Sequence, residues 1–298
     1  MVDIKGIISA NVTPMDANED INEKELRNHV NRSLAAGVDG VFCLGTNGEA
    51  YALNKEEKKF VIEAFVDEVK GRVPVYAGTG AATTRETIEL SKIAEAAGAD
   101  VLSIVAPFFA AASQQEIYNH YEAIAKSVNL PIVMYNIPAR AGNAIAPETV
   151  QRLAQLDNIV GVKDSSGNFD NILQYIELTD PKEFAVLSGN DSLILWTLQA
   201  GGAGGITAVA NLLPEIMVSI YSKFLEGDFQ GAKVFQDSIR PIRNCFKYGN
   251  PNTIIKNATN MLGMPVGNNR APFNYISPEA KDAIQATLEQ YYSEYFVK

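Results

Sequence analysis

The sequence predicts an α/β fold, a (β/α)8 TIM barrel with a C-terminal helical extension. Apolar runs alternate eight times with helical patterns between residues 6 and 210. Most of the runs are continuous rather than alternating, which is typical of parallel strands that are buried on both faces. Eight such units that close on themselves, with the helices outside, form this barrel.

The first four units each combine an apolar run with an amphipathic segment. Residues 6–14 form the first expected strand, and the helix at 22–36 places Ile21, Leu26 and Val30 on one face. The second unit joins a strand at 38–45 to a helix whose apolar residues run from Phe60 to Val66 among many charges. Strands at 73–80 and 100–107 follow, with helices at 84–97 and 114–128.

The last four units follow the same order. A strand at 130–138 precedes a helix that opens at Pro147 and ends near Leu156, since proline is favoured in the first helical turn. The sixth strand is apolar from Ile159 to Val162 and carries Lys163 at its carboxyl end. The helices at 170–178 and 193–200 and the strands at 184–189 and 205–210 complete the pattern.

Residues 212–298 are expected to form a helical extension of the same domain as the barrel, which occupies residues 1–211. Helical patterns cover 215–226, 231–248 and 278–292, and this segment is too short and too continuous with the barrel to form an independent domain. A doubly wound open sheet is the alternative fold. It is disfavoured because no Gly-x-Gly-x-x-Gly motif follows the first strand.

Composition excludes several classes of function. The formal net charge of −10 and the lack of a basic cluster argue against a nucleic-acid partner. Cys43 and Cys245 lie far apart and form neither a disulfide framework nor a metal-binding pattern, and Cys43 is expected to be a buried thiol. The N-terminus lacks a signal-peptide core, and no apolar run is long enough to cross a membrane. A cytoplasmic enzyme without membrane contact is expected.

Lys163 has two possible roles at the end of its apolar strand. Burial of an unpaired ammonium group is costly, so the lysine either extends outward or pairs with a carboxylate such as Asp164. The alternative is a desolvated amine with a lowered pKa, which attacks a carbonyl group and forms a Schiff base. The strand alone leaves both readings open.

The other strand ends favour the second reading. In barrels of this class the active site forms at the carboxyl ends of the strands. Those ends bring together Tyr135, Arg140 and the segments Gly45-Thr46-Asn47-Gly48-Glu49, Gly189-Asn190-Asp191 and Gly205-Ile206-Thr207. The first segment is a turn, and its glycines allow backbone N–H groups to approach an anion. Taken alone, the turn is also compatible with an ordinary connection to a helix capped by Asn54, and the tyrosine with packing.

Three motifs resemble one enzyme family. Gly45-Thr46-Asn47-Gly48-Glu49, Tyr135-Asn136-Ile137-Pro138 and Val162-Lys163-Asp164 are similar in order and spacing to those of the dihydrodipicolinate synthase and N-acetylneuraminate lyase family. The resemblance covers essentially the whole chain. It implies a class I aldolase, a lyase that holds pyruvate as a Schiff base and needs no metal or organic cofactor.

The resemblance also implies roles for individual residues. Lys163 matches the Schiff-base lysine and Tyr135 the general acid/base. Thr46 and Asn47 match the pair that binds the pyruvate carboxylate, and Thr46 is counted with the catalytic residues. Ile206 matches a residue whose carbonyl faces the site. Gly48 and Gly189 are further expected to border the substrate. The resemblance implies a homotetramer, a dimer of dimers that completes its sites near an interface.

The subfamily remains open. Arg140 resembles the arginine with which the synthases bind the carboxylate of aspartate semialdehyde. Two features depart from the synthase pattern: Asn47 replaces a threonine, and Phe108-Phe109 replaces the tyrosine of the proton relay. Retro-aldolases of 4-hydroxy-2-oxo acids, such as 4-hydroxy-2-oxoglutarate or 2-keto-3-deoxy sugar acids, are therefore a close alternative.

Two other readings rank lower. N-acetylneuraminate lyases lack the arginine and carry a glutamate where this chain has Ser192, and a non-catalytic oxo-acid-binding barrel would not need Lys163 and Tyr135 intact. The synthase ranks first because of Arg140. The expected small-molecule partners are pyruvate and an aldehyde or a 4-hydroxy-2-oxo acid.

Overall fold

The computed structural model describes residues 2–297 and contains a closed barrel of eight parallel strands. Each strand pairs with the next, and β1 also pairs with β8, which closes the barrel and excludes the open doubly wound sheet. The predicted (β/α)8 barrel is confirmed. Its strands are β1 (Gly6–Ala10), β2 (Gly40–Cys43), β3 (Val75–Gly78), β4 (Val101–Val105), β5 (Ile132–Asn136), β6 (Ile159–Asp164), β7 (Ala185–Ser188) and β8 (Gly204–Thr207).

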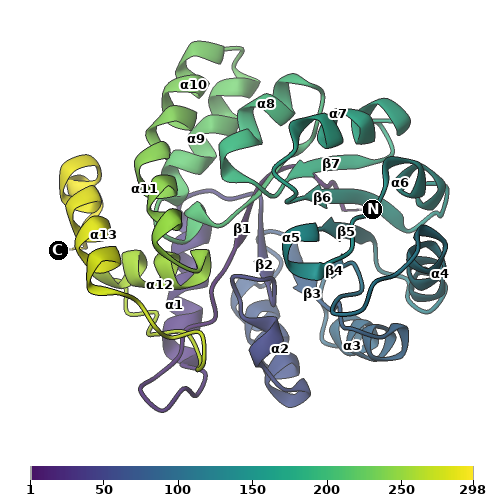
Figure 1. Ribbon diagram of the computed structural model, residues 1–298, viewed down its shortest axis with the longest axis horizontal. Coiled ribbons are helices and arrows are strands. Elements are labelled where there is room, and N and C mark those ends of the chain that lie inside the picture. The colour runs from purple at the N-terminus through teal and green to yellow at the C-terminus, as the bar shows by residue number, and fades with distance from the viewer. Residues whose placement is uncertain (1, 298) are drawn as a thin grey trace.

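Helices surround this barrel (Figure 1). They are α1 (Glu23–Ala35), α2 (Lys55–Val69), α3 (Thr84–Ala96), α4 (Gln114–Ala125), the short α5 (Pro138–Ala141), α6 (Pro147–Leu153), α7 (Phe169–Leu178) and α8 (Ile194–Gln199). Side-chain caps fix where several of them begin. Asn54 and Glu57 form a reciprocal capping box at the start of α2, which satisfies backbone N–H groups that would otherwise lack partners.

The C-terminal extension contains five α-helices among the described residues, namely α9 (Pro214–Leu225), α10 (Phe229–Ser238), α11 (Arg240–Asn244), α12 (Pro251–Met261) and α13 (Pro278–Tyr291). They lie together on one side of the barrel (Figure 1). The prediction of a single helix at 231–248 is wrong. Helix α10 ends at Ser238, α11 begins at Arg240, and a 3₁₀ helix follows at Cys245–Tyr248. Pro241 lacks an N–H group and cannot continue the preceding helix.

Several strands are shorter than predicted. β1 ends at Ala10 rather than at residue 14, although Asn11 to Pro14 remain buried. Hydrophobic pattern alone cannot tell a buried loop from a buried strand, because both exclude water. β6 instead continues past Lys163 to Asp164, so the lysine lies within the paired part of the sheet.

Two buried apolar clusters support the barrel. The larger lies between the sheet and the helices, and the smaller fills the barrel interior. The inner cluster contains one residue from each of β1, β2, β3, β7 and β8, namely Ile8, Phe42, Tyr76, Leu187 and Ile206. Because these side chains fill the barrel, it encloses no continuous channel. Strand residues beyond them, at the carboxyl ends, line the space above this packed interior.

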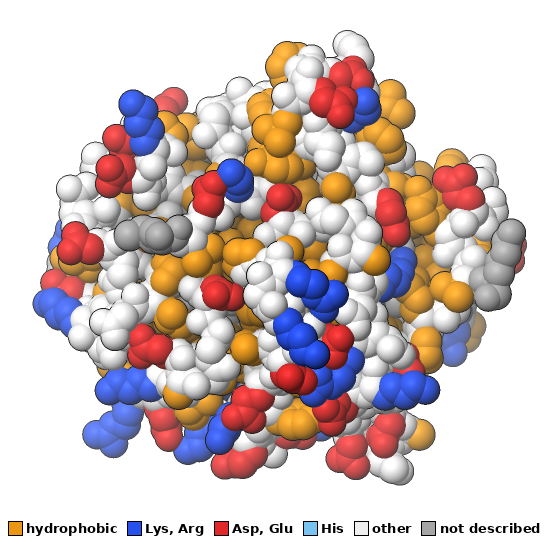
Figure 2. Space-filling model, turned by 180° about the vertical axis from the view of Figure 1, so that it is seen from behind, with side chains coloured by type: hydrophobic (Ala, Val, Ile, Leu, Met, Phe, Trp, Pro, Cys, Tyr) orange, Lys and Arg blue, Asp and Glu red, His pale blue; other side chains and the backbone are white. Residues whose placement is uncertain are grey.

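The charged surface and the lengths of the helices bear on the expected partners. Acidic and basic side chains are interspersed on the face shown in Figure 2. No helix within residues 2–297 has both the length and the apolar character needed to span a bilayer.

Candidate active site

Two neighbouring cavities open at the carboxyl ends of the strands. The inner one has a volume of about 230 Å³ and contains Lys163, and the outer one has about 610 Å³. Both are lined by Thr46, Tyr135, Ile137 and Arg140, so the two cavities share a wall. The strand ends named from the sequence therefore meet at one site, as expected.

Lys163 lies at the base of the inner cavity. Its side chain is 4% exposed, and the residue is paired in register with Tyr135 on β5. The Nζ atom lies 3.9 Å from the centroid of the Tyr135 ring and 5.3 Å from that of Phe42. Among residues 2–297 it forms no ion pair with a carboxylate. An unpaired amine at this depth is available to a carbonyl substrate.

Asp164 does not pair with the lysine, so that reading of the sequence is wrong. Successive strand residues point to opposite faces, and the Asp164 side chain is directed away from the barrel interior. Its Oδ2 accepts hydrogen bonds from Asn136 and Asn171, both at 2.7 Å. Its Oδ1 accepts bonds from the backbone N–H and the hydroxyl of Ser166. The aspartate thus fixes the end of β6 against its neighbours.

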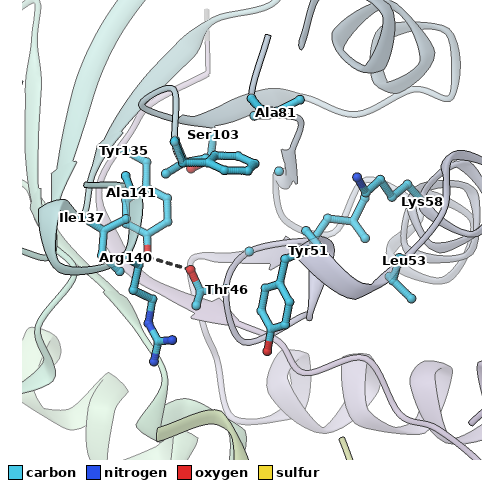
Figure 3. A pocket seen from close by; sticks show the side chains of 18 of the residues that line it. Thr46, Tyr51, Leu53, Lys58, Ala81, Ser103, Tyr135, Ile137, Arg140 and Ala141 are labelled. Atoms are coloured by element: carbon cyan, nitrogen blue, oxygen red, sulfur yellow. Dashed lines mark hydrogen bonds between the residues drawn. The ribbon is translucent and has the colours of Figure 1, made fainter. Parts of the chain in front are cut away.

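Tyr135 connects the lysine to the turn after β2. Its hydroxyl lies 3.2 Å from Thr46 Oγ1, the contact drawn in Figure 3. Burial by itself raises the pKa of this phenol, but the Lys163 charge and the hydrogen bond with Thr46 oppose it, and the net pKa of Tyr135 is lowered. A phenol that ionises more readily than usual is suited to proton transfer beside the amine.

The 45–49 turn packs closely against the ends of β1 and β2, and its residues Thr46 and Asn47 line the inner cavity. A Cβ atom at Gly48 would lie 2.9 Å from the Leu44 nitrogen, so only glycine fits this close approach. The Gly48 carbonyl accepts a 2.7 Å hydrogen bond from Thr13 Oγ1, and Asn47 Nδ2 donates a 3.3 Å bond to the Ala10 carbonyl. The turn is therefore held against the end of β1.

Gly189 and Ile206 also line the inner cavity with Lys163. Ile206 on β8 is 1% exposed and lines the inner cavity. A Cβ atom at Gly189 would lie 2.0 Å from Ser165 Oγ and 2.8 Å from Lys163 Cε. The space needed by the lysine side chain therefore requires glycine at this position.

We expect Gly189→Ala to lower the yield of the pyruvate–Lys163 adduct trapped by borohydride by about tenfold or more, because the displaced lysine loses its near-attack position. The control is Gly249→Ala, where the nearest atom to the added Cβ, Ile254 Cδ1, is 3.8 Å away. Trapped protein is quantified by intact mass. Equal yields for both variants would show that the lysine tolerates the displacement.

Arg140 and Arg243 bring two guanidinium groups to the inner cavity. Arg140, on α5, is exposed, and its Nη2 donates a 3.1 Å bond to Asn250 Oδ1. Arg243 was not identified from the sequence. It comes from α11 and contacts Asn190 Oδ1 at 2.7 Å and Asp191 Oδ2 at 3.3 Å. No local motif marks Arg243, because only the contact of the extension with the segment after β7 brings it here.

The two phenylalanines at 108–109 lie in different environments. Phe108 lines the outer cavity, whereas the Phe109 side chain is fully exposed and its backbone has a φ of 79°. A positive φ is unfavourable for a bulky residue in an isolated chain. Neither side chain has a hydroxyl group, so the Tyr135–Thr46 pair has no phenolic neighbour from this segment.

Comparison with known proteins agrees with this geometry. The sequence model of the Dihydrodipicolinate synthetase family matches residues 3–291. A 4-hydroxy-tetrahydrodipicolinate synthase from Methanopyrus kandleri is 41% identical over 290 residues, which is 96% of each chain. Among solved structures, that of the 4-hydroxy-tetrahydrodipicolinate synthase from Methylacidiphilum fumariolicum SolV has a TM-score of 0.94 and 32% identity, and the match covers 98% of this chain and 97% of that one.

A second solved structure holds a small oxo acid. The prophage protein YagE of Escherichia coli K12, a member of the dihydrodipicolinic acid synthase family in complex with pyruvate, has a TM-score of 0.92 and 31% identity, with coverage of 96% of this chain and 98% of that one. The match of one family model to nearly the whole chain, together with full-length relatives above 30% identity, establishes that this chain belongs to the dihydrodipicolinate synthetase family.

Proposed function

We propose that this protein is a 4-hydroxy-tetrahydrodipicolinate synthase, which condenses pyruvate with aspartate semialdehyde through a Schiff base on Lys163. The observation that carries the proposal is the contact of the buried, unpaired Lys163 amine with Tyr135, whose hydroxyl reaches Thr46. The curated relatives with this activity, among them the Methanopyrus kandleri enzyme, support it.

The chemistry follows from the positions of these groups. The neutral amine of Lys163 attacks the ketone carbon of pyruvate, and loss of water gives an iminium ion. The iminium withdraws electrons from the adjacent methyl carbon, which loses a proton and becomes an enamine nucleophile that adds to the aldehyde. Tyr135 lies beside the amine, so it can give and take the protons of water loss and of the new hydroxyl group.

The carboxylate of pyruvate is assigned to the 45–49 turn. Thr46 and Asn47 both line the inner cavity beside Lys163, and each carries a donor group. Gly48 lines neither cavity, but its lack of a Cβ atom lets the turn pack against Leu44 and Asn11, which supports Thr46 and Asn47. With the carboxylate held there, the ketone carbon of the substrate lies toward the amine, which is the orientation that addition requires.

Cleavage of 4-hydroxy-2-oxo acids is the second candidate function. The observation that favours it is the lack of a hydroxyl at Phe108 and Phe109, where a synthase relay would require a phenol, together with Asn47 in the turn. Arg140 is compatible with either acidic substrate. N-acetylneuraminate cleavage and simple oxo-acid binding fit less well, because Ser192 supplies no carboxylate for sugar hydroxyls and the Lys163–Tyr135 pair is intact.

A direct assay separates the two candidates. Condensation of pyruvate with aspartate semialdehyde is followed beside pyruvate release from a panel of 4-hydroxy-2-oxo acids. We expect a kcat/KM at least tenfold higher for condensation. A preference for cleavage of the panel would assign the protein to the aldolases instead.

Arg140→Ala is expected to raise the KM for aspartate semialdehyde by roughly 10- to 100-fold, the scale of a lost charge-assisted hydrogen bond. An aldehyde of similar size without a carboxylate serves as the control, and its kinetics are expected to change little. Steady-state rates with both aldehydes at saturating pyruvate provide the measurement. An equal loss for the two aldehydes would mean that Arg140 shapes the site without binding the carboxylate.

We further propose that the protein is a homotetramer built from two dimers, and we expect light scattering at micromolar concentration to give four times the chain mass. Phe109 supports the proposal, since it is fully exposed although it is large and apolar, and its backbone is strained. Phe109→Glu is expected to shift the mass toward smaller species, because a charge placed in an apolar interface is costly. A monomeric parent protein would contradict the proposal.

A further inference from the structure

Helix α12 of the C-terminal extension contacts the 45–49 turn at two points. Asn252 Nδ2 donates a 2.5 Å hydrogen bond to the Thr46 carbonyl, and Lys256 Nζ lies 2.6 Å from Glu49 Oε1. The two residues are four positions apart, so they lie on the same face of the helix. One helical face therefore holds both the residue before and the residue after Asn47 and Gly48.

The Lys256–Glu49 ion pair is fully buried, since both side chains have 0% exposure. Lys256 Nζ also donates a 2.9 Å hydrogen bond to the Asn268 carbonyl, and Glu49 Oε2 accepts a 2.9 Å bond from the Arg270 backbone N–H. Burial lowers the pKa of Lys256 although Glu49 opposes that effect. Taking two charges out of water is costly, and an apolar pair would fill the same space at less cost.

The backbone of the turn has an unusual conformation at Glu49, the acidic member of the ion pair. Glu49 has a φ of 56° and a ψ of 34°, a left-handed conformation that is uncommon for residues other than glycine. Such a conformation persists only where surrounding contacts impose it. Backbone hydrogen bonds to Thr46 and from Ala52 hold Glu49 within the turn, and the extension adds the ion pair and the Arg270 N–H group.

We propose that Lys256, Glu49 and Asn252 are positioning residues that hold the 45–49 turn in the conformation that binds the pyruvate carboxylate. This inference rests on the proposed function, in which Thr46 and Asn47 bind that carboxylate. The extension then contributes to the binding of pyruvate, although none of its hydrogen bonds or ion pairs described within residues 212–297 involves Lys163 Nζ.

The inference predicts a selective kinetic defect. If α12 only supports folding, its variants lose stability while the surviving enzyme keeps its kinetic constants. If it positions the turn, the KM for pyruvate rises on the order of 10- to 100-fold, the scale of a misplaced substrate. The KM for the aldehyde and the kcat at saturating pyruvate change much less, because neither depends on capture of free pyruvate by the turn.

The experiment uses three variants of the full chain and one control. Lys256→Met leaves Glu49 buried without a partner and is expected to lower the melting temperature as well. Glu49→Gln/Lys256→Met removes both charges, and the melting temperature is expected to return toward that of the parent protein. Asn252→Ala removes the contact with Thr46. Ile284→Ala, at a fully buried position on α13, is the control for loss of stability within the extension.

Borohydride trapping and steady-state kinetics with pyruvate then give a clear result. We expect the double variant to keep a raised KM for pyruvate despite its recovered melting temperature. We expect Ile284→Ala to have a lowered melting temperature and an unchanged KM for pyruvate. A parent protein that traps pyruvate, with a double variant of unchanged KM, would overturn the inference and leave the proposed function intact. A parent protein that traps no pyruvate would overturn both.

Discussion

Replacement of Lys163 with alanine is expected to abolish both borohydride trapping of pyruvate and turnover, with a loss of roughly 10⁴-fold or more, since removal of a covalent nucleophile leaves only binding and electrostatic contributions. The parent protein, treated with pyruvate and borohydride, is expected to gain the mass of one reduced pyruvyl group on the peptide that contains Lys163. No other side chain in the inner cavity carries a primary amine, because its other cationic groups are the guanidinium groups of Arg140 and Arg243.

Lys58→Ala provides the matched control, because Lys58 is the lysine that borders the outer cavity. Burial lowers the pKa of Lys58, so this variant tests whether a partly desolvated amine outside the inner cavity can form the adduct. We expect this variant to keep the label on Lys163 and most of its activity. A pyruvyl label on Lys58 or on any other lysine would exclude the mechanism.

The Tyr135→Phe variant is expected to lose on the order of 10²-fold or more in kcat, the usual scale for a general acid/base, while it still traps pyruvate. The phenyl ring keeps the packing against Lys163, and only the hydroxyl that reaches Thr46 is removed. Trapping and turnover therefore respond differently to the same substitution. Single-turnover and steady-state rates measure the two effects.

Tyr121→Phe tests whether loss of any buried phenol has the same result. The Tyr121 hydroxyl donates a 2.8 Å bond to the Ile104 carbonyl outside the site, and burial raises its pKa. We expect this control to keep its kcat. An unchanged kcat in Tyr135→Phe would show that Tyr135 packs against the lysine without transferring protons.

The barrel and the placement of Lys163 beside Tyr135 were predictable because the signals are local. Continuous apolar runs predict strands buried on both faces, and a (β/α)8 barrel brings all carboxyl ends to one rim. Lys163 and Tyr135 could thus be placed together although they are far apart in the sequence. They are paired across β5 and β6, as are the next residues Asn136 and Asp164, which are 28 positions apart. Strand ends were less predictable, as the buried loop after Ala10 shows.

The contribution of the C-terminal extension could not be predicted. Arg243, Asn252 and Lys256 lie on helices that have no distinctive local motif, and their partners are in loop segments far away in the sequence. Helical periodicity identifies which face of a helix is buried, but not what covers that face. Lys256 is buried against a carboxylate, whereas a rule based on residue type alone would place a lysine at the surface.

Closure of the barrel has a consequence for the synthesis of the chain. β1 obtains its second neighbour only from β8, with Gly6 opposite Gly204 and Ile8 opposite Ile206. Until residues 204–207 have left the ribosome, one edge of β1 has no partner, and unpaired strand edges promote association between chains. Contacts between such distant segments also form slowly. Nascent chains truncated before β8 are therefore expected to aggregate or to bind chaperones, whereas chains released after β8 can close the barrel.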